Sequence, residues 1–176
     1  ATGGAGRLYP PPYGQPFAIG HPPYNTGDGH MMAFQAGAAL SNMEFIGCAV
    51  SPKGFNVPGI TGFLSMGAYL LNARGERYMF HYHPWGEHAP RNLVAYAMYK
   101  EGEEGRGPCY VDCRHLTHEA IEFIRRGIRN ERIILLDYLA ARGIDIARDP
   151  VPFEVRRYGV EGTGLMIDER CSSTVE

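Results

Sequence analysis

The sequence predicts an α+β protein, and three observations support that class. Segments with helical periodicity and segments with strand-like composition are mixed along the chain as separate elements. The 176 residues are 44% hydrophobic and 20% charged, which is enough apolar material for one globular core with appendages. No internal repeat of solenoid length is visible. We therefore expect discrete helices packed beside strands and short hairpins.

The first quarter of the chain is rich in glycine and proline. The glycine cluster at residues 3–6 has two interpretations, a loop that comes close to a ligand or a flexible terminus. The prolines at 10–12 exclude a helix there. After the 27–29 turn a small-residue helix is predicted, with Asp28 as its candidate N-cap.

The middle of the chain predicts a loop, a hairpin and a helix. Residues 48–61 contain four glycine or proline residues, which commonly interrupt helices and strands, and therefore predict a loop. Residues 68–80 predict a hairpin whose turn lies at 72–75 and whose second strand begins at Glu76. Residues 89–105 predict a helix that ends at a glycine.

The last part of the chain continues the mixture of helices and strands. Residues 107–116 predict a strand. Residues 117–146 predict two helices separated around Gly127, with Thr117 as a candidate cap. Residues 151–176 predict short strands and turns.

Charge and cysteine content exclude several classes of protein. The formal net charge is -2, and no run of basic residues alternates with aromatic ones. The sequence therefore does not predict binding to nucleic acid or to an anionic membrane. No apolar stretch is long enough to span a bilayer, so a cytoplasmic protein is expected. The four cysteines match no zinc or C-x-x-C spacing, and Cys109 and Cys113 would share one strand face, which favours reduced thiols.

Two polar segments allow more than one interpretation. His81, His83 and His88 include an H-x-H spacing that could aim two imidazoles at a metal. No fourth ligand has an obvious spacing, so a packed loop of histidines and aromatics is the alternative and no metal site is assigned. The glutamate-rich residues 101–107 are predicted to form a solvated, flexible turn.

Several stretches taken together resemble one known family. They are ATGGAGRLY at the start, NTGDGHMMAFQAGAALSNMEF, APRNLVAYAM followed by YVDCRHL, and GLMIDERCSSTVE at the end. In order and spacing these are similar to the flavoprotein subunits of succinate dehydrogenases and fumarate reductases, whose relatives include L-aspartate oxidase and adenylylsulfate reductase. The similarity extends over essentially the whole chain.

The resemblance implies a domain organisation. Residues 1–47 would be a segment of the FAD-binding domain, 48–157 the capping domain that faces the substrate, and 158–176 the return towards the FAD-binding domain. FAD would be the cofactor of the full-length parent. The chain would be a fragment, because the G-x-G-x-x-G pyrophosphate loop would lie before Ala1. Alone, it is expected to hold FAD poorly and to be inactive.

The resemblance also implies roles for individual residues. Arg91 falls on the family arginine that donates a proton to the substrate, and a surface arginine at a helix start is the alternative. An arginine suits that role only in a dry pocket or near a second cation, because its ordinary pKa is far above neutral. The implied cofactor-binding residues are Ala1, Thr2, Gly3, Gly4 and Asp28.

Other family positions are replaced in this sequence. Ala49 stands near the place of a family histidine, and Ile60 and Thr61 stand in place of a threonine–glutamate pair. Leu64 replaces an arginine and Gly159 a second histidine. Those groups would bind the two carboxylates of fumarate or succinate. The sequence therefore predicts a different small substrate.

The implied function is an FAD-dependent oxidoreductase that transfers hydride between flavin and a small molecule. An adenylylsulfate-reductase-like flavoprotein and a non-catalytic assembly module are the alternatives. The implied partners are the remainder of the flavoprotein chain, the small-molecule substrate and an iron–sulfur subunit, with no nucleic acid. The expected location is the cytoplasm, with a peripheral place on the inner face of a membrane complex.

Overall fold

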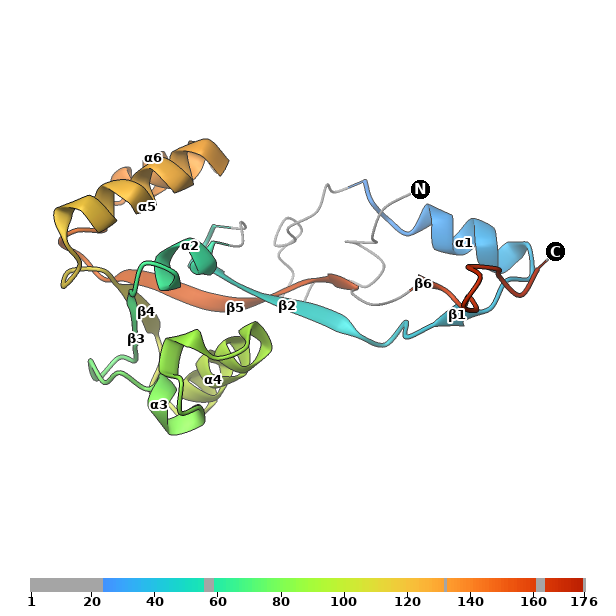
Figure 1. The fold of residues 1–176 in the computed structure, drawn as a ribbon, viewed down its shortest axis with the longest axis horizontal. Helices are drawn as coiled ribbons and strands as arrows, with labels where there is room; N and C mark the ends of the chain where they lie inside the picture. The colour runs from blue at the N-terminus through green and yellow to red at the C-terminus, as the bar shows by residue number, and fades with distance from the viewer. Residues whose placement is uncertain (1–23, 56–58, 132, 161–163, 176) are drawn as a thin grey trace. The chain divides into compact units, whose positions relative to one another are not determined.

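The computed structural model describes residues 24–55, 59–131, 133–160 and 164–175, and it has a mixed helix and sheet fold. The chain divides into two compact units. The terminal unit combines Ala1–Cys48 with Arg156–Glu176, and the central unit is Ala49–Val155. Figure 1 shows the elements of both units. In the described part of the chain, no helix has the length and apolar character needed to cross a membrane.

The terminal unit is built from a helix and a two-stranded sheet. Helix α1 (Asp28–Gln35) precedes β1 (Leu40–Ser41), which pairs antiparallel with β6 (Gly164–Leu165). The Ala39 N–H donates a 2.7 Å hydrogen bond to Thr174 Oγ1. These contacts join the beginning and the end of the described chain within one unit.

The central unit is organised around a four-stranded sheet in the order β2-β5-β4-β3. Its strands are β2 (Ile46–Pro52), β3 (Tyr69–Leu71), β4 (Cys109–Asp112) and β5 (Val151–Val160). Strand β4 pairs antiparallel with both β3 and β5. Buried side chains from all four strands enter one hydrophobic core, among them Val50, Leu70, Val111 and Val151.

Short and long helices cover this core. They are α2 (Ile60–Leu64), α3 (Met79–Tyr82), the 3₁₀ helix η2 (Gly86–His88), α4 (Arg91–Glu103), α5 (His118–Glu131) and α6 (Ile133–Ala140). Helices α5 and α6 lie side by side (Figure 1). Phe63 of α2 meets Phe153 of β5 edge to face, with 5.7 Å between ring centroids. This contact ties α2 to the sheet.

The prediction of a loop over residues 48–61 is wrong, because the structure has a strand and a helix there. Strand β2 lies at the edge of the sheet, where a proline at the strand end removes no required hydrogen-bond donor. Pro52 ends the strand, and Lys53 N–H still donates to Pro152 O at 2.8 Å. Gly59 then precedes α2 as its N-cap. Pro52 and Gly59 thus mark the ends of elements.

The predicted hairpin is only half correct. Strand β3 forms as expected, but the second strand from Glu76 is reduced to a single bridge between Leu71 and Arg77, and α3 follows. Helix α3 begins at Met79, which leaves only residues 76–78 for a second strand. The Asn72 side chain closes the turn by accepting from the N–H groups of Arg74 and Glu76, both at 3.0 Å.

The helices of the second half were predicted more closely. Helix α4 and strand β4 lie inside the expected ranges. The break at Gly127 is wrong, because α5 continues through it to Glu131. A helical glycine costs only about 1 kcal/mol relative to alanine, and the buried Ile121 and Ile124 anchor this helix. The Thr117 cap is confirmed, since its hydroxyl accepts from Ala120 N–H at 3.3 Å.

The cysteines are free thiols in the structure. Cys48 and Cys171 are exposed, whereas Cys109 and Cys113 are buried. Burial raises the pKa of Cys109 to about 11 and that of Cys113 to about 12. The two buried thiols therefore stay protonated near neutral pH and serve as core side chains.

Candidate functional site

Arg91 is the first residue of α4, and the chain around it is anchored on both sides. Pro90 is the N-cap, with a fixed backbone angle that suits a helix start. Ala89 before it and Val94 after it are buried, at 7% and 1% exposure. The Arg91 side chain itself is exposed. The fold thus presents a cation at a helix N-terminus, where the helix dipole does not favour one.

The partner of Arg91 is a neutral hydroxyl. Arg91 Nη1 donates a hydrogen bond to Thr61 Oγ1 on α2, thirty residues earlier in the chain. Helix α2 is short, but Ile60 is 2% exposed and Phe63 is fully buried, so the helix is held in the core. Thr61 lies on the exposed side of this anchored helix. The two side chains therefore meet at the surface of a rigid central unit.

The charge of Arg91 is not balanced locally. Within the described ranges, Arg91 has no ion pair, whereas Arg77, Arg106, Arg114 and Arg125 each contact a carboxylate. A guanidinium has five N–H donors and suits carboxylate or phosphate groups. Arg91 is consequently an exposed cation that can bind an anionic ligand group.

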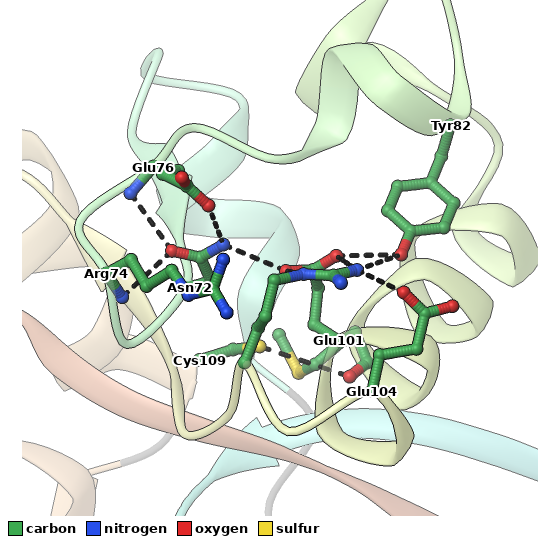
Figure 2. A network of polar contacts seen from close by, with 9 residues as sticks. Asn72, Arg74, Glu76, Tyr82, Glu101, Glu104 and Cys109 are labelled. Carbon is green, nitrogen blue, oxygen red and sulfur yellow. Dashed lines mark hydrogen bonds and ion pairs between the residues drawn. The ribbon is translucent and has the colours of Figure 1, made fainter.

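The far part of α4 is fixed by a buried carboxylate. Glu101 is 2% exposed and accepts from Arg106 at 2.6 and 2.9 Å, from Asn72 Nδ2 at 2.9 Å and from the Tyr82 hydroxyl at 2.7 Å. Figure 2 shows Asn72 and Tyr82 converging on Glu101 from opposite sides. Mainly through the Arg106 hydrogen bonds, the pKa of Glu101 falls to about 2. This network links α4 to the β3 turn and to α3.

The prediction of a solvated, flexible turn over residues 101–107 is therefore wrong in its first part, because residues 101–103 belong to α4 and Glu101 is buried. Glu101 is buried because Arg106 folds back onto it, while Glu104 receives a second 2.5 Å contact from the same guanidinium. The sequence contains both charges five positions apart. It does not show that Asn72 and Tyr82, from distant segments, complete the set of donors.

A second buried carboxylate holds the segment before α4. Glu87 of η2 is 4% exposed, accepts two hydrogen bonds from Arg77 at 2.8 Å, and accepts from Leu70 N–H at 3.1 Å. Burial alone would raise its pKa, but the Arg77 and Leu70 hydrogen bonds outweigh that effect and the pKa lies below its usual value. The position of Arg91 is thus set by ionic contacts before and within α4.

The histidine cluster lies on the same stretch but shows no metal geometry. His81 and His88 are exposed, and His83 Nδ1 accepts from Trp85 N–H at 3.2 Å. The His83 and Trp85 rings meet edge to face at 5.2 Å. Among the residues that the structure describes, no three His, Cys, Asp or Glu side chains are close enough to share a metal ion.

Asp28 belongs to the terminal unit, and its predicted role as N-cap is wrong. Gly27 is the N-cap, with the left-handed φ of 90° that a residue without Cβ adopts readily, and Asp28 is the first helical residue. The Asp28 carboxylate is exposed and accepts from the Thr26 hydroxyl at 2.9 Å. The other expected cofactor residues, Ala1, Thr2, Gly3 and Gly4, lie outside the described residues.

The replaced family positions differ in what they now do. Ile60 and Leu64 are core residues at 2% and 6% exposure, and Ala49 has no polar side-chain group. Among those that the structure describes, Thr61 contacts a predicted site residue, Arg91. Sequence reasoning singled out Thr61 only as a replaced acid and missed its bond to Arg91, because nothing local predicts that α2 and α4 meet.

Comparison with known proteins gives consistent matches. Residues 1–173 match the family model described as an FAD binding domain. The chain is 36% identical over 180 residues to a fumarate reductase (CoM/CoB) subunit of Methanothermobacter marburgensis, covering 96% of the chain and 30% of that protein. It is 35% identical over 162 residues to the succinate dehydrogenase flavoprotein subunit of Rickettsia bellii, covering 86% and 25% respectively.

The structural comparison agrees with the sequence matches. An E. coli quinol fumarate reductase has 28% sequence identity and a TM-score of 0.74, over 98% of this chain and 31% of that chain. The chain thus spans less than a third of the length of each of these three proteins. The similarity extends across both units of the described fold.

Proposed function

Because the chain belongs to the FAD-binding-domain family of fumarate reductase and succinate dehydrogenase flavoproteins, we propose that it is part of an FAD-dependent oxidoreductase. In this proposal the central unit is the capping domain and the terminal unit contributes segments of the FAD-binding domain. The reaction is hydride transfer between flavin and a small substrate. The observation that carries the proposal is the exposed, locally unbalanced Arg91 on an anchored helix start.

The described residues of the terminal unit fit a flavin. Gly27 brings the backbone into α1 with a positive φ, and the Asp28 carboxylate beside it is exposed. A carboxylate accepts hydrogen bonds, so Asp28 can bind a hydroxyl or N–H donor of the cofactor, and the N-terminus of α1 offers backbone N–H donors. Ala1 to Gly4 complete the proposed cofactor contact. When bound, FAD supplies the hydride chemistry.

Arg91 has two proposed tasks at the substrate. Its positive charge binds and orients an anionic group. When hydride adds to one atom of a double bond, the neighbouring atom becomes an anion that must take up a proton, and Arg91 delivers it. Thr61 accepts one N–H of Nη1, which leaves the second N–H of Nη1 and those of Nη2 and Nε as donors for the substrate. The capping domain excludes water while this happens.

The substrate proposed here is less anionic than a dicarboxylate. The core positions of Ile60 and Leu64, and the apolar Ala49, leave these sites without charge-assisted donors for a second carboxylate. An adenylylsulfate-reductase-like substrate remains the second prediction, but no described residue favours it. The proposed partners are the remainder of the flavoprotein and an iron–sulfur subunit, with a peripheral place on the cytoplasmic face of a membrane complex.

Purification of the flavoprotein that carries this chain tests the proposal. We expect a flavin absorbance spectrum that is bleached by a reduced viologen dye and restored by an unsaturated monoanionic substrate. Fumarate should be a poorer oxidant than such a substrate. A protein without flavin, or a reduced flavin that no unsaturated acid reoxidises, would favour the non-catalytic assembly module instead.

A further inference from the structure

We infer that Thr61 is the positioning residue for Arg91. This inference rests on the proposed function for its catalytic meaning, but the contact itself is a property of the central unit. Thr61 Oγ1 accepts from Arg91 Nη1, and this is the hydrogen bond that Arg91 makes among the described residues. Thr61 acts by fixing the guanidinium of Arg91.

The geometry around Thr61 makes it a rigid support. Threonine is branched at Cβ, which restricts its χ1 angle and therefore the direction of its hydroxyl. Its neighbour Ile60 is 2% exposed, so the backbone of α2 cannot move easily. At the other end, the buried Ala89 and Val94 hold the first turn of α4. The hydrogen bond between these two anchored helices therefore restricts where the guanidinium can lie.

The chemistry of the partner matters as much as its position. A hydroxyl accepts a hydrogen bond without neutralising the charge, whereas a carboxylate partner would compensate the guanidinium as Glu87 compensates Arg77. Arg91 is thereby oriented and yet keeps its full charge for an anionic substrate. Because the guanidinium is already restricted before the substrate binds, less rotamer entropy is lost on binding.

Three variants of the flavoprotein test the catalytic consequence. Thr61→Val keeps the shape and removes the acceptor, and it should lower kcat about 10-fold with KM unchanged within about twofold, since one hydrogen bond that matters in the transition state is lost. Thr61→Ser keeps the hydroxyl and should stay within about threefold of the parent. Ser65→Ala removes the hydroxyl of the C-cap residue of α2, which donates to Gly62 O at 3.2 Å, and should leave kcat unchanged.

A chemical readout tests the contact without any activity. Phenylglyoxal modifies arginine by bridging its two terminal nitrogens, and Nη1 of Arg91 is engaged by Thr61. We expect Thr61→Val to modify at Arg91 several-fold faster than the parent, as measured by mass spectrometry of the peptide. Arg148, whose side chain is 85% exposed, should react equally in both proteins.

The two readouts separate the two proposals. If no unsaturated acid is reduced but Arg91 reacts faster in Thr61→Val, the proposed function fails and the positioning contact stands. If Arg91 reacts at the parental rate in Thr61→Val, or if kcat stays within about twofold of the parent while Arg91→Lys is inactive, the positioning role is overturned. An equal decrease in kcat in Thr61→Ser and Thr61→Val would also overturn the positioning role, since the hydroxyl would then be irrelevant.

Discussion

The hydrogen bonds of Glu101 should make the stability of the central unit depend on pH within a defined range. The pKa of Glu101 falls from 4.5 to about 2, chiefly because Arg106 donates to it. At about 1.4 kcal/mol per pKa unit this corresponds to about 3 kcal/mol. Arg106 is 24% exposed, which weakens the interaction by solvent screening. We therefore expect Glu101→Gln to lower the free energy of unfolding by about 2 kcal/mol at pH 7.

The sign of the pH dependence follows from the direction of the shift. A carboxylate with a lowered folded-state pKa stabilises the protein above its unfolded-state pKa. That contribution is lost as the pH falls from about 4.5 towards about 2. The stability difference between the parent and Glu101→Gln should therefore shrink over this interval. Other carboxylates titrate equally in both proteins and cancel in the difference.

Far-UV circular dichroism in urea provides the assay, because α4, α5 and α6 lie in the central unit and lose their helical signal when that unit unfolds. Glu103→Gln is the matched control, because it removes the same charge from an exposed position of the same helix. A loss below about 0.5 kcal/mol for Glu101→Gln, or a loss that does not change between pH 5 and pH 2.5, would refute the reasoning.

Two further outcomes are expected for the 176-residue chain. Gly86→Ala should destabilise it more than Gly75→Ala in urea unfolding: both glycines have left-handed φ, but a Cβ at Gly86 would lie 2.7 Å from the Phe80 ring, whereas the space at Gly75 is open. Equal losses would contradict this. Ellman's reagent should label two thiols rapidly in the native protein and leave Cys109 and Cys113 unlabelled, because burial raises their pKa. Rapid labelling of all four thiols would contradict this prediction.

Local signals in the sequence predicted the elements whose interactions are local. Helix α4 and the cap at Thr117 follow from periodicity and from a hydroxyl three residues before its N–H donor. The family and its cofactor, FAD, could also be predicted from the sequence, because several motifs in a fixed order are far more specific than one glycine motif. The match to the FAD binding domain family confirms both predictions.

Non-local pairing explains what the sequence could not predict. Strand β2 was missed because edge strands tolerate proline. The second hairpin strand was overpredicted because α3 begins at Met79 and leaves only residues 76–78 before it. The burial of Glu101 depends on Asn72 and Tyr82, which lie 29 and 19 residues away. The contact of Thr61 with Arg91 likewise joins helices that no local pattern relates.

Arg91→Lys in the flavoprotein tests the central claim most directly. Lysine keeps the charge but loses the planar donor fork, so the variant should retain its flavin spectrum and its fold. General acid–base catalysis typically contributes about 100- to 10,000-fold, and turnover with the best substrate should fall by that order. Arg148→Lys, at an exposed position, is the control that should not change turnover. Turnover of Arg91→Lys within about threefold of the parent, well below the acid–base range, would contradict the catalytic role of Arg91.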